Sequence, residues 1–273
     1  MKLGGAVLCG GRSSRMGRPK ALLRWEGGTL VEHAVATLRR VVDSVVVVAS
    51  ADLAVPEMAD VRVVRDRDPN LGPLGGIREA LEASEADLIF VTSTDAPFLT
   101  TAFVERVLSF GTAAAPRVDG WVQTLSAAYP KALAAEASRL IAEERIRPLF
   151  LLEAGSFRPI EPDELPELDS LRNLNTPDDY LEAVRGTGSV SVELMGLAYR
   201  AAGRSELDPV PPGRLGDVLA HVQRSVPTLE LLDGDELAAS FLVSLDGHAF
   251  LREPSIPIGP GDRLVILDAA TGG

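Results

Sequence analysis

The stretch SVVVVAS, residues 44–50, places four consecutive valines and an alanine between two serines. β-Branched side chains favour strands, and a strand without polar alternation is expected to be buried on both faces. A helical repeat immediately precedes it in residues 29–42, with apolar positions at Leu30, Ala34, Leu38 and Val41. A helix that leads into such a strand is typical of a parallel sheet covered by helices.

The same alternation continues on both sides of the valine run. Residues 5–10 and 61–64 are typical of strands, residues 73–84 have helical periodicity, and residues 87–98 form a buried strand that runs into an acidic loop. Alternating strands and helices predict an α/β domain with a Rossmann-like, mostly parallel sheet. Ligands bind such sheets at the carboxyl ends of the strands, where the glycine-rich and acidic loops are expected.

A second, smaller domain is predicted after residue 189. A helix in residues 175–185, capped by Thr176, is expected to close a first domain of residues 1–186, and residues 187–189 form a linker. Residues 190–203 are expected to form a strand and the start of a second. A helix at 214–224 and two strands within 239–251, joined by an Asp-Gly turn, complete an α+β domain of residues 190–273.

Composition excludes several classes of protein. The net charge of −12 argues against nucleic acid or an anionic membrane as the main partner. No apolar run approaches the roughly 18 residues that span a bilayer, and the N-terminus is too short and too glycine-rich for a secretory signal, so a cytoplasmic location is expected. Cys9 is the single cysteine, so neither an internal disulfide nor a zinc site is expected.

The loop LCGGRSSRMGRPKALL, residues 8–23, combines glycines with positive charge. Gly10 and Gly11 let main-chain N–H groups approach an anion, and four cations follow: Arg12, Arg15, Arg18 and Lys20. From the residues alone, a phosphate cradle and a solvated basic turn are equally open. Lys20 is one of three lysines among 27 basic residues, which favours a specific role for its ammonium group.

The spacing G-G-x-S-x-R-M-G-x-x-K resembles the signature loop of nucleotidyltransferases that join an NTP to a phosphorylated acceptor and release pyrophosphate. It is carried by Gly10, Gly11, Ser13, Arg15, Met16, Gly17 and Lys20. The LCGG start is similar to that of the molybdenum cofactor guanylyltransferases. Three further motifs of that family follow in order: RDRDPNLGPLGG at 65–76, TSTDAPFL at 92–99 and NLNTPDDY at 173–180. At 122–129, VQTLSAAY departs from the family's usual Gln-Pro-Leu.

This resemblance implies the substrates GTP and molybdopterin, the cofactor Mg²⁺ and a set of site residues. Lys20, Arg15 and Asp95 would be catalytic, with Asp95 on the metal. The nucleotide would be bound by these three together with Leu8, Cys9, Gly10, Gly11, Ser13 and Asp66. Asn173 and Asn175 would bind the acceptor, although helix capping is an alternative role for asparagines before a helix.

The segment from residue 190 resembles the small subunit of molybdopterin synthase, a ubiquitin-like β-grasp sulfur carrier. The shared features are VELMGLAYRAAG, RLGDVLAHV, PIGPGDRLVIL and the pair Gly272–Gly273. The resemblance implies that the Gly273 carboxylate is adenylated and converted to a thiocarboxylate. It also implies two protein partners, the molybdopterin synthase large subunit and an adenylating activator. The alternative is a frayed terminus.

Two other functions remain open for the whole chain. A related nucleotidyltransferase would use CTP or another NTP on a cofactor or sugar phosphate, which the Gly10–Gly11 pair disfavours. A catalytically inactive scaffold for the carrier domain would not need Lys20, Arg15 and Asp95, all of which are present.

Overall fold

The valine run forms strand β4 (Ser44–Ala49), buried on both faces as predicted. Val45 and Val47 pack into one hydrophobic core, and Val46 and Val48 pack into another on the opposite face of the sheet. The computed structural model describes residues 1–10 and 16–269. Within these ranges β4 belongs to an eight-stranded sheet with the order β10-β7-β9-β6-β1-β4-β5, and β8 pairs with β7.

Most neighbours in this sheet are parallel, which confirms the α/β prediction. The pairs β1–β4, β4–β5, β1–β6 and β7–β10 are parallel, whereas β9 runs antiparallel to β6 and β7. The remaining strands are β1 (Leu3–Cys9), β5 (Val61–Arg65), β6 (Leu88–Ser93), β7 (Ala114–Val118), β8 (Trp121–Val122), β9 (Ser126–Pro130) and β10 (Arg158–Ile160).

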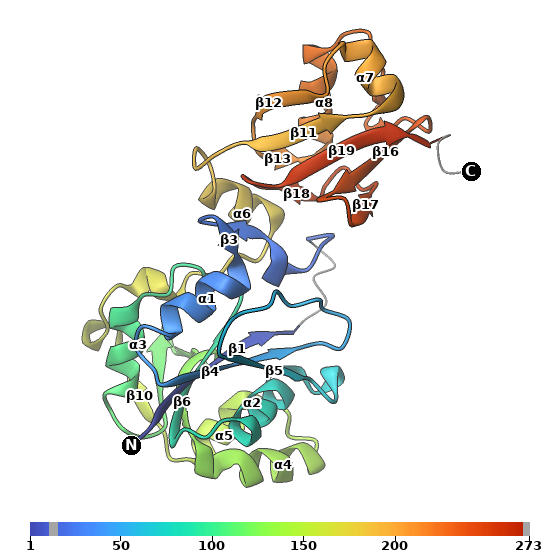
Figure 1. The fold of residues 1–273 in the computed structure, drawn as a ribbon. Helices are drawn as coiled ribbons and strands as arrows, with labels where there is room; N and C mark the ends of the chain where they lie inside the picture. The colour runs from blue at the N-terminus through green and yellow to red at the C-terminus, as the bar shows by residue number, and fades with distance from the viewer. Residues whose placement is uncertain (11–15, 270–273) are drawn as a thin grey trace. The chain divides into compact units, whose positions relative to one another are not determined.

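Helices cover both faces of the sheet (Figure 1). The core on one face holds α1 (Leu30–Leu38) and α3 (Thr101–Leu108); the other holds α2 (Gly72–Ala83), α4 (Ala134–Ala142) and α5 (Pro148–Ala154). Short 3₁₀ turns connect these elements: η1 (Lys20–Leu22), η2 (Pro69–Leu71), η3 (Lys131–Leu133), η4 (Pro162–Glu164) and η5 (Leu168–Leu171). Over the described ranges, no helix combines the length and hydrophobicity needed to cross a membrane.

Spatial contacts divide the described chain into two units. Unit 1 contains residues 1–10, 20–22 and 29–173, and therefore the whole large sheet. Unit 2 contains residues 174–269 together with two short N-terminal segments, 16–19 and 23–28. The sequence predicts a first domain of residues 1–186 and a linker at 187–189, and both bounds stay predictions.

Unit 2 is built on a five-stranded sheet with the order β12-β11-β19-β16-β17. The central pair β11–β19 is parallel and the other pairs are antiparallel. The strands are β11 (Val190–Leu194), β12 (Glu206–Val210), β16 (Phe241–Leu245), β17 (Ala249–Leu251) and β19 (Arg263–Asp268). The apolar residues of α8 (Leu215–Ser225) share one core with this sheet. Three short ladders are also present: β2 (Arg24–Trp25) with β3 (Gly28–Thr29), β13 (Gly213–Arg214) with β18 (Pro257–Ile258), and β14 (Leu232–Asp233) with β15 (Glu236–Leu237).

Local predictions for unit 2 have mixed outcomes. The Asp246–Gly247 hairpin between β16 and β17 is confirmed, and both turn residues have positive φ angles (53° and 78°). Thr176 caps α6 (Pro177–Ala183) through a capping box with Asp179, also as predicted. The second strand expected before residue 203 is wrong, because GLAYRAA forms helix α7 (Gly196–Ala202). Alanine, leucine and arginine favour helix, and the Leu197 N–H donates to Asp268 Oδ1 (2.8 Å).

Candidate functional site

The site is placed by the order of the strands in unit 1. Strands β4 and β6 lie on opposite sides of β1 and both run parallel to it. The order of the sheet therefore reverses at β1, and a crevice is expected beyond the carboxyl ends of β1 and β6. Gly10 follows β1 and Asp95 lies two residues after the end of β6, so both are at this edge.

A cavity of about 190 Å³ lies at these strand ends, which we call the strand-end pocket. Because sites for drug-sized ligands usually exceed about 300 Å³, the described residues enclose room for part of such a ligand. The pocket is lined by Leu8, Gly10, Val48, Ser50, Asp66, Gly72, Pro73, Gly76, Ser93, Asp95 and Leu125.

Asp95 is held from two sides. The Ser93 hydroxyl donates to its Oδ1 (2.5 Å), and the Lys20 Nζ lies 3.6 Å from its Oδ2. The side chains of Lys20 and Asp95 are 20% and 25% exposed, so a ligand in the pocket can reach both charges. The structure thus places a cation and an anion, 75 residues apart in the chain, at one pocket.

Asp66 supplies a second carboxylate to the pocket wall. Its main-chain N–H donates to the Ala49 carbonyl (2.8 Å), which continues the β4–β5 ladder past the end of β5. Its Oδ1 accepts from the Asp68 N–H (3.1 Å), which fixes the carboxylate in a turn. The carboxylate positions therefore follow from the ends of two different strands.

The donor set of the pocket fits Mg²⁺ better than a softer metal. Asp66 and Asp95 offer carboxylate oxygens, and none of the pocket-lining residues within the described ranges is a histidine or cysteine. Among the residues with assigned positions, no cluster of three or more metal-ligating side chains occurs. Mg²⁺ typically binds one or two carboxylates and completes its shell with substrate phosphates and water, so Asp95 and Asp66 would hold the ion only together with a substrate.

Three of the residues that line the pocket are glycines: Gly10, Gly72 and Gly76. Gly72 has a φ angle of +60°, which favours glycine, and a Cβ there or at Gly10 would project into open space. At Gly76 a Cβ would lie 3.3 Å from both Leu8 methyl groups, so this glycine lets α2 approach β1 closely. The GPLGG motif therefore has a packing role as well as a position on the pocket.

The predicted nucleotide residues have different positions. Leu8, Gly10, Asp66 and Asp95 line the strand-end pocket, and Lys20 reaches it through Asp95. Cys9 does not line the pocket: side chains alternate along β1, and its thiol packs in the core on the other face. Burial raises the pKa of the Cys9 thiol to about 12. The other predicted loop residues, Gly11, Ser13 and Arg15, lie outside the described residues.

The predicted acceptor residues Asn173 and Asn175 are not among the residues that line the strand-end pocket. Asn173 and Asn175 are exposed, and the Asn175 main-chain N–H donates to Asp179 Oδ2 (2.9 Å). That bond uses the main chain of Asn175 and joins the cap of α6, whose N-cap residue is Thr176, so it assigns no capping role to the side chain of either asparagine. Gly272 and Gly273 lie outside the described residues.

Several pocket residues were missed in the sequence. Ser93 is the clearest, because its position two residues before Asp95 is the signal that could have revealed a hydroxyl directed at the carboxylate. Ser50, Pro73 and Leu125 also line the pocket; Pro73 lies in the motif at 65–76 and Leu125 in the segment at 122–129, but neither residue was singled out from the sequence.

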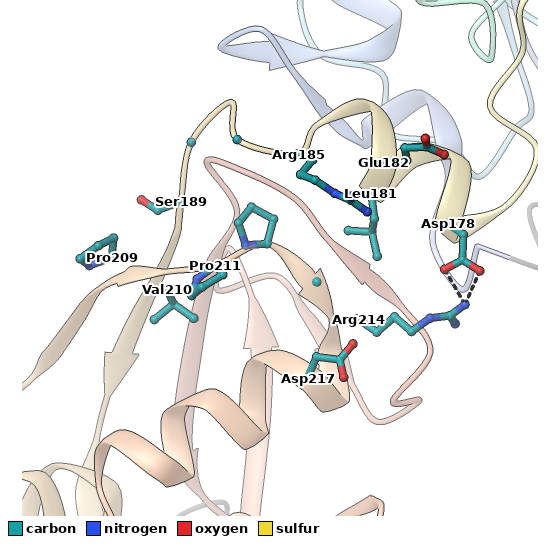
Figure 2. Close-up of a pocket in the computed structure, with 14 residues that line it drawn as sticks. Asp178, Leu181, Glu182, Arg185, Ser189, Pro209, Val210, Pro211, Arg214 and Asp217 are labelled. Atoms are coloured by element: carbon teal, nitrogen blue, oxygen red, sulfur yellow. Dashed lines mark hydrogen bonds and ion pairs between the residues drawn. The ribbon is translucent and has the colours of Figure 1, made fainter.

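Unit 2 has a hollow of its own, of about 690 Å³, beside the chain that follows α6 (Figure 2). Arg214 donates to both carboxylate oxygens of Asp178 (2.9 and 3.0 Å) at its edge. The remaining charged side chains on its wall are of both signs: Glu182, Arg185 and Asp217. This mixture favours no single ligand charge, and we assign no chemistry to the hollow.

Comparison with known proteins agrees with the geometry of unit 1. The chain is 32% identical over 191 residues to a "Probable molybdenum cofactor guanylyltransferase" of Bacillus thuringiensis (strain Al Hakam), which covers 67% of this chain and 96% of the relative. A protein of the same name in Bacillus mycoides (strain KBAB4) is 31% identical with the same coverage. Among solved structures, the molybdopterin-guanine dinucleotide biosynthesis protein A of Archaeoglobus fulgidus matches with a TM-score of 0.55 and 25% identity, covering 66% of this chain and 96% of that one.

The family match covers the elements that build the strand-end pocket. The MobA-like NTP transferase domain matches residues 5–156, from β1 through α5, which is more than half of the chain. Every residue that lines the pocket lies in this range. The chain therefore belongs to the MobA-like NTP transferase family and is a nucleotidyltransferase.

Proposed function

We propose that unit 1 transfers GMP from GTP to molybdopterin, or to its molybdenum form, and releases pyrophosphate. The observation that carries this proposal is the Lys20–Asp95 pair at a pocket that also holds Asp66. The names of the relatives in Bacillus and Archaeoglobus supply the acceptor and the nucleotide.

The chemistry accounts for the residue types. Attack of an acceptor phosphate on the α-phosphorus of GTP brings two polyanions together, so the protein must neutralise charge and align the reacting groups. Lys20 and Arg15 would bind the triphosphate with the N–H groups near Gly10 and Gly11, and stabilise the leaving pyrophosphate. Mg²⁺ supplies Lewis-acid stabilisation of the phosphoryl oxygens when bound, and Asp95 would hold it.

The base and the acceptor would be bound by different residues. Leu8 and Gly10 would line the guanine subsite, because both already line the pocket. Asp66 would contact the nucleotide or the metal. Asn173 and Asn175 would contact the pterin.

A panel of nucleotides tests the proposal. Purified protein is mixed with molybdopterin, MgCl₂ and GTP, CTP, ATP or UTP, and pyrophosphate release is measured. We expect turnover with GTP and loss of it in Asp95→Asn with the circular dichroism spectrum unchanged. Selective turnover with CTP would support the pyrimidine alternative. If none of the four nucleotides is turned over, the inactive scaffold would be supported. Full activity of Asp95→Asn at saturating Mg²⁺ would overturn the role of Asp95.

We propose a second function for the C-terminal region, as a ubiquitin-like sulfur carrier. The supporting observation is the sheet order β12-β11-β19-β16-β17. Strands β11 and β19, the first and last along the chain in this sheet, pair in parallel next to each other, and α8 shares a core with the sheet. A β-grasp domain of residues 190–273 after a linker at 187–189 would carry sulfur on Gly273, next to Gly272. Its partners would be an adenylating activator and the molybdopterin synthase large subunit.

Mass spectrometry tests this second function. With an adenylating activator, ATP and a sulfur donor, the full chain is expected to gain the thiocarboxylate mass shift. Deletion of Gly272 and Gly273 should prevent that shift and leave GMP transfer unchanged. A truncated chain that still gains the shift would refute the assignment.

A further inference from the structure

We propose that Asp262 is a positioning residue for nucleotidyl transfer: it holds Arg18, and through it the segment that carries Lys20. Arg18 lies in the signature loop, two residues before Lys20, but it belongs to unit 2 by its contacts. Asp262 precedes β19, the central strand of unit 2. The inference rests on the role proposed above for Lys20, and the experiment below distinguishes a failure of that role from a failure of the role of Asp262.

The Arg18–Asp262 pair has the geometry of a specific anchor. Arg18 Nη1 donates to Asp262 Oδ2 (2.7 Å) and Nη2 donates to Oδ1 (3.1 Å), a forked contact between two planar groups. Arg18 is 8% exposed and Asp262 is fully buried. The Gly259 N–H also donates to Asp262 Oδ2 (2.8 Å), so the orientation of the carboxylate does not depend on the guanidinium alone.

The two residues directly before Arg18 are also closely packed. Met16 is 1% exposed. Gly17 has a φ angle of +65°, and a Cβ on it would lie 2.5 Å from Ile256 Cγ1, so the position requires glycine for both conformation and space. A side chain at position 17 could therefore be accommodated only by displacing Ile256.

A second arginine anchors the chain after Lys20. Arg24 Nη2 lies 3.1 Å from Asp246 Oδ2, and its Nε lies 3.7 Å from Asp262 Oδ1. The hydroxyl of the buried Tyr180 donates to the Arg24 carbonyl (2.9 Å). Lys20 is thus held between two arginines that share one buried carboxylate.

Two anchors this close to Lys20 limit the conformations of the intervening backbone. Ordering a backbone residue costs about 1–2 kcal/mol, and a site that orders its residues before the substrate arrives does not lose that free energy on binding. A buried ion pair adds little to stability compared with apolar residues of the same volume, so a role in specifying conformation explains it better. Asp262 acts on the reaction through Lys20 and touches no reacting atom.

A double-mutant cycle on the full-length chain tests this role. The value of kcat/KM for GTP is measured by pyrophosphate release for wild type, Asp262→Asn, Lys20→Ala and the double variant. We expect Asp262→Asn to lower kcat/KM about tenfold in the wild-type background, mainly by raising KM, and by less than about twofold when Lys20 is absent. A purely structural role would give equal losses in both backgrounds and overturns the proposal.

The exposed pair Asp178–Arg214 of unit 2 supplies a matched control, and Asp178→Asn is expected to leave kcat/KM within about twofold. If Asp262→Asn does not fold, Arg18→Lys takes its place in the cycle, because it keeps the charge and loses only the fork. A wild-type chain without turnover on any nucleotide overturns the proposed function. An active wild type with an unaffected Asp262→Asn overturns the positioning role alone.

Discussion

Removal of the Ser93 hydroxyl should weaken catalysis without unfolding unit 1. In Ser93→Ala the carboxylate of Asp95 loses the donor to Oδ1 and keeps Lys20, 3.6 Å from Oδ2. The Cβ that faces the pocket remains, so no cavity forms in the core. The change thus isolates one hydrogen bond to a charged group.

The size of the effect follows from the exposure of Asp95. A hydrogen bond to a charged group contributes about 1.5–3 kcal/mol. Because the Asp95 side chain is 25% exposed, water can replace the lost donor, and the lower end of that range applies. A loss of about 1.4 kcal/mol in transition-state stabilisation corresponds to a tenfold lower kcat/KM.

Steady-state pyrophosphate release with saturating acceptor measures this loss. We expect Ser93→Ala to lower kcat/KM for GTP about tenfold and Ser93→Thr, which retains a hydroxyl, to restore most of it. Ser109→Ala serves as the control, since that hydroxyl caps α3 and donates to the Arg106 carbonyl (2.7 Å). If Ser93→Ala has wild-type kcat/KM at every MgCl₂ concentration, the hydroxyl does not orient Asp95 for the reaction.

Three further predictions concern charge, capping and pH. Lys20→Ala should lower kcat/KM about 10²–10³-fold, as expected for a lost phosphate donor, whereas Lys131→Ala, whose ammonium contacts the Ser84 carbonyl, should leave it unchanged; similar losses in both would contradict a specific role for Lys20. Thr176→Ala should lower the free energy of unfolding of unit 2 by about 1 kcal/mol in urea denaturation, and Thr176→Ser should restore it; an unchanged midpoint would mean that the cap contributes nothing. The folded-state pKa of Cys9 is raised from 9.0 to about 12, so its stabilising effect is complete below pH 9 and is lost as pH rises toward 12. Between pH 9 and pH 10 the wild type should therefore lose about 1 kcal/mol more than Cys9→Ala in urea unfolding, and equal losses would refute burial of the thiol.

Sequence patterns predicted unit 1 well because its signals are local. The valine run of β4 and the neighbouring strand β1 are apolar and buried on both faces, so period and composition agree there, whereas the edge strand β5 (VRVVR) is largely exposed. The antiparallel insertion of β9 between β6 and β7 was not foreseen, because pairing direction depends on residues far apart in the chain. Helix α7 was missed for the opposite reason: its seven residues are too few to establish a helical period.

The site residues also differ in whether a local sequence pattern could reveal them. Asp66 and Asp95 could be predicted because each follows a strand within a recognisable motif, and strand ends meet at one edge of a parallel sheet. The Cys9 side chain could have been excluded from the pocket by the alternation of side chains along β1, since Leu8 faces the pocket. Arg18 and Asp262 are separated by 244 residues, and no local pattern links them.

The way in which Asp262 would act limits how large the effect of its loss can be. The relatives match this chain over 191 residues, which are 67% of its length and 96% of theirs. Under the proposal, Asp262 contacts Arg18 and touches no reacting group, so it affects the reaction only through the backbone next to Lys20. Its loss should change affinity by about one order of magnitude rather than abolish turnover, whereas loss of Lys20 removes a charge that the reaction itself requires.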